Sequence, residues 1–106
     1  MPYRVYILEC ADGSYYTGSA ANVEERLLQH QEGVYPDAYT FTRRPVKLVW
    51  CSEETARYSD ALRFERQVKG WSRAKKEALM RDDYDGIHEI VKEERKRREK
   101  KKKDSR

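Results

Sequence analysis

The stretch YRVYILECADGSYYTG, residues 3–18, decides the fold. Tyrosine, valine, isoleucine and leucine are frequent before its centre, tyrosine and threonine follow, and Asp12-Gly13 lies between the two parts. Aromatic and β-branched residues on both sides of an Asp-Gly pair are typical of a β-hairpin, because Asp-Gly supplies the backbone conformations of a tight turn. We therefore expect two antiparallel strands at the start of the chain.

A short helix is expected after the hairpin. Asn22 precedes a helical pattern over residues 23–30, Glu25 lies three residues after Asn22, and Gly33 follows the end of the pattern. A side-chain oxygen at the N-cap with a glutamate three residues later is a capping box, and glycine commonly ends a helix. Residues 33–45 mix glycine, proline, threonine and tyrosine without periodicity, so we expect a loop there.

The second half of the folded part is predicted to hold one strand and two helices. Residues 46–51 alternate well enough for a third strand. From Ser59, a good N-cap, apolar residues recur at helical spacing until about Gly70. Ser72 can cap a further helix that ends near residue 80. Strands and helices are thus interleaved in the order β-β-α-β-α-α, which indicates a small α/β sandwich.

Length and composition limit the classes of protein to consider. A chain of 106 residues fits one compact domain and excludes a multidomain enzyme, and a domain of this size needs neither disulfides nor a metal for stability. With 38% hydrophobic residues and no apolar run near the ~20 residues of a membrane span, we expect a soluble protein with no membrane partner. The N-terminus does not resemble a secretory signal, so we expect a cytoplasmic location. Cys10 and Cys51 are interpreted as two half-buried thiols.

Positive charge is concentrated at the C-terminal end. Residues 91–106 hold ten lysines and arginines and four acidic residues, which leaves residues 1–90 at a formal charge of −2 within a total of +4. We expect a folded domain over residues 1–86 and a basic tail over residues 87–106, either a helical extension or a disordered arm. Such a tail either only solubilises the protein or raises its affinity for polyphosphates through counterion release.

Three polar residues lie on faces that should be apolar. Arg26 and His30 are four residues apart and fall at the edge of the face of residues 23–30 that would pack on the core. Glu65 falls inside the apolar arc of the helix expected after Ser59. Glu65 is interpreted either as a structural ion pair, with Arg26 or Lys69 as partner, or as a metal ligand.

These residues together resemble the GIY-YIG nuclease superfamily, most closely its small stand-alone bacterial members, over about residues 3–80. The resemblance rests on Val5-Tyr6-Ile7, Tyr16-Thr17-Gly18, Arg26, His30 and the segment around Glu65. It implies an α+β fold with a three-stranded antiparallel sheet flanked by helices.

The resemblance also implies the roles of the site residues. Tyr6 and Tyr16 would be the signature tyrosines, Arg26 the signature arginine and His30 an active-site polar residue. Glu65 would bind one divalent cation, Mg²⁺ or Mn²⁺, because these ions prefer oxygen ligands and need few protein groups. Tyr16 would activate the attacking water, which requires the metal, Arg26 or a neighbouring base to lower its pKa from about 10.

The length of the hairpin loop tests this site. A two-residue loop over residues 12–13 would put Tyr6 and Tyr16 on opposite faces of the sheet. A three-residue loop over residues 11–13, with Gly13 left-handed, would put both tyrosines on one face. We predict the three-residue loop because only this register lets the two tyrosines share a site.

Three functions stay open at this point. The first is a metal-dependent endonuclease that cuts DNA, branched or damaged DNA included, with little sequence preference. The second is a nucleic-acid-binding module of the same fold with little or no catalysis, and the third is a protein-interaction module. A homodimer or a protein partner is also left open. The expected phosphate contacts are Arg43, Arg44, Lys47, Lys96, Arg97, Lys100 and Lys101.

The sequence departs from the family pattern at two points. Ser19 stands where some members have a basic residue just after the second motif, and no match is found for an asparagine late in the domain.

Overall fold

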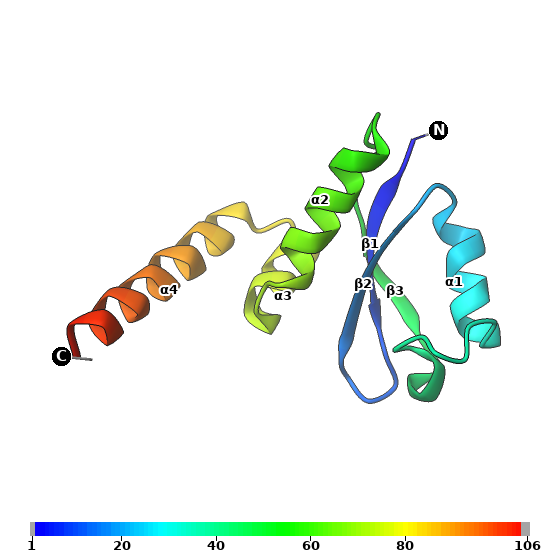
Figure 1. Ribbon diagram of the computed structural model, residues 1–106, viewed down its shortest axis with the longest axis horizontal. Coiled ribbons are helices and arrows are strands. Elements are labelled where there is room, and N and C mark those ends of the chain that lie inside the picture. Colours follow the sequence, from blue (N-terminus) through cyan, green and yellow to red (C-terminus); the bar gives the residue numbers. More distant parts are fainter. Residues whose placement is uncertain (1, 105–106) are drawn as a thin grey trace. The chain divides into compact units, whose positions relative to one another are not determined.

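The computed structural model of the protein describes residues 2–104, and the side chains of residues 2–100. Its contacts divide the chain into two units, residues 1–70 and residues 71–106. In chain order the elements are β1 (Arg4–Glu9), β2 (Tyr15–Ala20), α1 (Val23–Glu32), a short 3-10 helix η1 (Phe41–Arg43), β3 (Lys47–Cys51), α2 (Tyr58–Lys69), α3 (Arg73–Met80) and α4 (Tyr84–Asp104) (Figure 1). The expected α+β fold, with a three-stranded antiparallel sheet and flanking helices, is confirmed.

The hairpin has the predicted three-residue loop. Tyr6 pairs with Gly18 and Leu8 with Tyr16, so the two tyrosines share one face of the sheet. Gly13 has φ 83°, the left-handed conformation that this loop requires and that glycine adopts without steric cost. The sequence-based register is therefore confirmed.

The two faces of the sheet pack on different helices. The strand order is β2-β1-β3, with β1 in the centre. Val5 and Ile7 are fully buried on the face that α2 covers, whereas α1 lies against the opposite face (Figure 1). The core under α1 is formed by Tyr6, Leu8, Cys10, Ala20, Val23 and Val46. The side chains of β1 thus alternate between two buried faces, as expected for a central strand.

A register shift interrupts β3. Ile7 pairs with Trp50 but Leu8 pairs with Leu48, so Val49 is an extra residue in the ladder. As a result Leu48 and Cys51, three residues apart, both pack against the core under α1. The simple alternation expected for residues 46–51 is broken here, because a bulge reverses the side-chain pattern on its two sides.

The predicted caps of α1 are present. Asn22 Oδ1 accepts a hydrogen bond from the backbone N–H of Glu25 at 3.0 Å. Gly33 ends the helix with φ 69°. The helix runs to Glu32, two residues beyond the expected end, and the expected loop that follows it contains η1.

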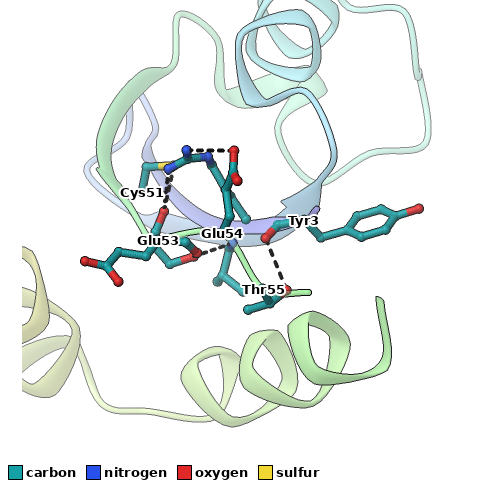
Figure 2. Close-up of polar contacts among 8 residues, drawn as sticks. Tyr3, Cys51, Glu53, Glu54 and Thr55 are labelled. Atoms are coloured by element: carbon teal, nitrogen blue, oxygen red, sulfur yellow. Dashed lines mark hydrogen bonds and ion pairs between the residues drawn. The ribbon is translucent and has the colours of Figure 1, made fainter. Parts of the chain in front are cut away.

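The predicted N-cap of α2 is wrong. The helix begins at Tyr58 with Arg57 as its N-cap, so Ser59 already lies inside the first turn. The cause is an anchor just before the helix, where Thr55 exchanges backbone hydrogen bonds of 3.2 and 2.8 Å with Tyr3 and its hydroxyl also bonds the Tyr3 carbonyl (Figure 2). This tertiary contact sets where the chain leaves the sheet, and it overrides the preference of serine for the cap position.

The second unit consists of two helices. Ser72 Oγ caps α3 by accepting from the N–H of Lys75 at 3.3 Å, as predicted. A 3.7 Å ion pair between Lys75 and Glu94 joins α3 to α4. The tail is helical through Asp104, and residues 95–100 are all exposed. Within residues 2–104 no helix is both long and apolar enough to cross a membrane.

Candidate active site

Tyr6 and Tyr16 lie side by side on the face of the sheet that α1 covers. Their ring centroids are 6.4 Å apart, and Tyr6 is only 1% exposed. Gly18 makes room for them, because a Cβ at this position would lie 2.5 Å from the Tyr6 hydroxyl oxygen and 3.2 Å from a ring carbon of Tyr16. The glycine of the second motif is therefore required by a close approach and not by a turn.

His30 connects α1 to the two tyrosines. Its Nε2 lies 3.1 Å from the Tyr6 hydroxyl oxygen, and its ring centroid is 5.2 Å from that of Tyr16 in an edge-on arrangement. On its other side, Nδ1 lies 2.8 Å from the hydroxyl of Thr40. His30, which the resemblance implied to be a polar residue of the site, thus makes its hydrogen-bond contact with Tyr6.

Arg26 lies one helical turn before His30 and acts electrostatically on the groups around it. Burial raises the pKa of Tyr6 far above its usual value, and the charge of Arg26 and a hydrogen bond from it only partly oppose this effect. Burial and the positive charge of Arg26 both lower the pKa of His30. At neutral pH, Tyr6 therefore keeps its proton and His30 is uncharged.

Tyr16 is half-buried beside the carboxylate of Glu65. Burial raises the pKa of Tyr16, the negative charge of Glu65 raises it further, and Arg26 lowers it. The net direction is upward, so among the residues described Arg26 does not by itself make Tyr16 acidic enough to serve as a base at neutral pH. Lys69 contributes a cation 5.6 Å from the centre of the Tyr16 ring.

Glu65 projects from α2 and has Ser19 of β2 as its partner. The Ser19 hydroxyl donates to Glu65 Oε1 at 3.0 Å, and both residues are half-buried. The partner is thus neither Arg26 nor Lys69, the two considered from the sequence. Ser19, noted above as a departure from the family pattern, fixes one carboxylate oxygen and leaves Oε2 for another ligand.

A cleft of about 840 Å³ opens beside Glu65 and Arg26. Its walls come from the end of β2, from α1 and α2, and from single residues before β1 and after α1. The lining residues are Tyr3, Ser19, Ala20, Ala21, Asn22, Glu25, Arg26, Gln29, Tyr35, Tyr58, Leu62 and Glu65. The Tyr3 and Tyr58 rings meet edge to face at 4.8 Å. A half-buried carboxylate and a guanidinium therefore open into one space.

The donor set fits a hard divalent cation that keeps most of its water. Among the described side chains, no group of three or more His, Cys, Asp or Glu residues lies close enough together to bind a metal. Zinc would need such a group, whereas Mg²⁺ and Mn²⁺ are commonly bound by one or two carboxylates and several waters. Glu65, with one oxygen held by Ser19 and with the cleft in front of it, fits this second pattern.

A stack of side chains that was not expected from the sequence reaches Tyr16 from the loop after α1. Tyr39 stacks on Tyr16 at 6.3 Å with 17° between the rings, and the Arg43 guanidinium carbon lies 3.8 Å from the centre of the Tyr39 ring. Arg43 is held in turn by an ion pair with Asp12 at 3.1 Å. The loop has no periodicity, so the only sequence signal for this stack was the four-residue separation of Tyr39 and Arg43.

Some of the predicted phosphate contacts are held by hydrogen bonds within the protein, whereas others are exposed to solvent. Arg43 donates to the carbonyl of Tyr39 at 2.8 Å and Arg44 to that of Phe41 at 2.9 Å, so both are tied to their own loop. Lys47 is exposed at the start of β3. Of the phosphate contacts predicted on α4, Lys96, Arg97 and Lys100 are exposed, and the side chain of Lys101 lies outside the described part.

Comparison with known proteins gives consistent matches. The family model described as the GIY-YIG catalytic domain matches residues 2–78. A UPF0213 protein of Syntrophus aciditrophicus is 47% identical over 79 residues, which is 74% of this chain and 90% of that protein. A UPF0213 protein of Natronomonas pharaonis is 44% identical over 81 residues, 76% of this chain and 93% of that protein.

A solved structure shares the same architecture. The solution NMR structure of the protein EF2693 from E. faecalis is 31% identical, covers 79% of this chain and 88% of that chain, and superimposes with a TM-score of 0.54.

Proposed function

This chain belongs to the GIY-YIG family, a family of nucleases, and from that premise we propose that it is an endonuclease that hydrolyses DNA phosphodiester bonds with the help of one divalent cation. The observation that carries the proposal is the convergence of Tyr16, Arg26 and Glu65 at one edge of the sheet, where Arg26 and Glu65 line the same cleft.

In this proposal each residue has a separate task. Tyr16, once it has lost its own proton to solvent, takes a proton from the water that attacks phosphorus. The bond from phosphorus to the leaving oxygen breaks as the new bond forms, and the leaving oxygen takes a proton from solvent. Arg26, a permanent cation, binds a phosphate oxygen on which negative charge develops. Tyr6 keeps its proton and donates a hydrogen bond to the phosphate.

Glu65 would hold the cation through Oε2, with Ser19 keeping Oε1 in place. Mg²⁺ or Mn²⁺ bound there would neutralise charge on the phosphoryl oxygens and stabilise the departing oxygen. The cation would also offset the charge of Glu65, which is one of the two causes that raise the pKa of Tyr16.

A nucleic-acid-binding module that does not cleave is the second candidate. The raised pKa of Tyr16 favours it, because a tyrosine that keeps its proton cannot serve as a base. The basic helix α4 would supply affinity for phosphates in either case. The two candidates differ in one outcome, since only the nuclease converts supercoiled plasmid into nicked circles.

The test is plasmid nicking by the full chain with Mg²⁺, with Mn²⁺ and with chelator. Glu65→Gln keeps an oxygen that can accept from Ser19 but removes the charge that would hold the cation. We expect the nicking rate to fall by about 10²- to 10³-fold, as when one electrostatic contact to a transition state is lost.

Glu32→Gln is the matched control, because Glu32 is exposed at the end of α1. We expect it to nick at the parent rate. Nicking by Glu65→Gln at the parent rate would contradict the proposed site, and binding of DNA by the parent without nicking under any metal condition would favour the second candidate.

A further inference from the structure

Three tyrosines line the cleft beside Arg26 and have no task in the proposed reaction. Tyr3 precedes β1, Tyr58 begins α2 and Tyr35 follows α1, and all three lie among the residues that line the cleft of about 840 Å³. Tyr58 is 54% exposed and Tyr35 is 45% exposed. A single exposed tyrosine is ordinary, whereas several at one cleft indicate a binding surface.

Tyr3 and Tyr58 form a pair whose backbone is held in place. Thr55 and Tyr3 exchange backbone hydrogen bonds of 3.2 and 2.8 Å, which fix the start of β1 to the segment that leads into α2 (Figure 2). The Tyr3 ring points away from this anchor (Figure 2) and meets the Tyr58 ring edge to face at 4.8 Å. In such a pair the ring that contributes its edge keeps both of its faces for other groups. The pair is therefore an aromatic surface that is positioned before any ligand binds.

Tyr35 adds a third ring from the end of α1. Its hydroxyl donates to Gln29 Oε1 at 3.4 Å, and Gln29 lies about one helical turn after Arg26. A hydrogen bond of this length is weak, so it guides the ring and still lets the ring adjust to a ligand. The helix that carries the proposed phosphate-binding arginine thus also leads to an adaptable aromatic side chain.

The charges of the cleft suit one phosphate and not a run of phosphates. The charged lining residues are Arg26, Glu25 and Glu65, which leave a formal charge of −1. A divalent cation at Glu65 would bring this charge to +1, enough to balance one phosphodiester. A second phosphate in the cleft would meet carboxylates without a counterion, which is unfavourable. The aromatic part of the cleft therefore suits an uncharged group that is attached to the bound phosphate.

A nucleobase is the uncharged group that nucleic acid offers next to a phosphate, and it must be unpaired to use these rings. In a duplex each base is stacked between its neighbours, and the grooves present only base edges. An unpaired base offers a π face to an aromatic side chain, and each such stack contributes substantially to affinity whatever the base. The three tyrosines thus fit a substrate with an unpaired nucleotide beside the phosphate to be cut.

We propose that Tyr3, Tyr35 and Tyr58 form a subsite that stacks an unpaired nucleobase of the substrate, next to the phosphate bound at Arg26. The substrate class is DNA in which a paired segment adjoins an unpaired nucleotide. The inference rests on the proposed function for the position of the cut, whereas base binding does not depend on cleavage. Because stacking does not read base identity, the subsite selects DNA structure and not sequence.

The binding test uses the full chain and three fluorescent duplexes of equal length. One duplex is fully paired, one has a short thymine bulge, and one has the same bulge with abasic nucleotides. Anisotropy is measured with Ca²⁺ in place of Mg²⁺ and again with chelator, so that binding is followed without metal-dependent cleavage. We expect the thymine bulge to bind about 5- to 100-fold more tightly than the abasic bulge. Equal affinity for these two duplexes would overturn the proposal, because their backbones are the same.

Substitutions of the exposed tyrosines locate the base. Tyr58→Ala should lose most of the preference for the thymine bulge over the abasic bulge, and Tyr58→Phe should keep it, since the ring and not the hydroxyl stacks. Tyr84→Ala is the matched control at an exposed tyrosine outside the lining of the cleft. An unchanged preference in folded Tyr58→Ala would overturn the proposal. Should that variant not fold by circular dichroism, Tyr35→Ala decides in the same way.

Cleavage distinguishes this inference from the proposed function. With Mg²⁺ we expect the parent to nick the thymine-bulge duplex beside the bulge and faster than the paired duplex, and Tyr58→Ala to reduce this difference. Nicking of all three duplexes at one rate would overturn the base subsite and leave the nuclease in place. Binding that depends on the unpaired base, without nicking under any metal condition, would contradict the proposed hydrolysis and not the subsite.

Discussion

The polar groups at the edge of β2 and those on α4 differ in number, in burial and in whether their side chains have a fixed partner. At the edge of β2 a few polar side chains are wholly or partly buried, and His30 and Glu65 each have an assigned partner. On α4, residues 95–100 are exposed and all charged. Buried, oriented groups have the shifted pKa values and fixed distances that bond breaking requires. Exposed charges interact with phosphates of any sequence, but they are screened by salt.

The comparison teaches that net charge is a poor guide to where chemistry occurs in this protein. The formal charge of +4 comes from a segment of +6, whereas the part that contains the candidate site is formally negative. We therefore expect substitutions at the β2 edge to change the rate of cleavage, and substitutions on α4 to change affinity and its dependence on salt.

The largest effect is expected for Tyr16→Phe. Removing the hydroxyl removes the proposed base, so the rate of DNA nicking should fall by about 10²- to 10⁴-fold, while DNA affinity stays near that of the parent. Gel-shift and nicking assays on the same preparation measure both quantities. Tyr84→Phe is the matched control at an exposed tyrosine of α4, and a similar loss of rate there would argue against a specific role of Tyr16.

The second largest effect is expected for Gly18→Ala. The new Cβ would lie 2.5 Å from the Tyr6 hydroxyl oxygen, and Tyr6 is buried and cannot move outwards. We expect the free energy of unfolding, measured by denaturant titration, to fall by about 1–3 kcal/mol. Nicking should fall as well, since the tyrosines would be displaced.

Gly70→Ala is the control for that variant, because the nearest atom to a Cβ there is 3.7 Å away and the backbone is right-handed. It should change stability little. Gly18→Ala with parent stability would mean that the two tyrosines are less tightly packed than the structure describes.

A triple variant of α4 should change affinity and leave the rate at saturating DNA unaltered. With Lys96, Arg97 and Lys100 replaced by glutamine, the slope of log affinity against log salt should become less steep by up to about 3, roughly one for each lost phosphate contact. Glu93→Gln and Glu99→Gln should act in the opposite direction. An unchanged slope in the triple variant would remove α4 from the DNA contacts and leave it a solubilising segment.

The smallest effect is expected from the titration of His30. Burial and Arg26 lower the pKa of folded His30, so the unfolded chain binds its proton more tightly. The stability linked to His30 is therefore complete above the unfolded pKa of about 6.5 and is lost as pH falls from there toward the folded pKa. His30→Gln should flatten this part of a pH–stability curve, and His88→Gln should not.

Predictions from the sequence succeeded where the signal is local. The Asp-Gly hairpin, the Asn22 cap and the Gly33 terminus each depend on residues within a few positions of one another, and all are present. The start of α2 was predicted wrongly, because the anchor between Thr55 and Tyr3 joins residues 52 positions apart.

The sequence by itself determined which residues face inward, because the periods of strands and helices are local properties of the chain. It placed Tyr6 and Tyr16 on one face and turned Glu65 toward the sheet. Only the tertiary structure decided the partners of those residues, namely Ser19 for Glu65 and Thr40 for His30. No periodicity carries such pairings, since each depends on how the separate elements and loops pack once the core has formed.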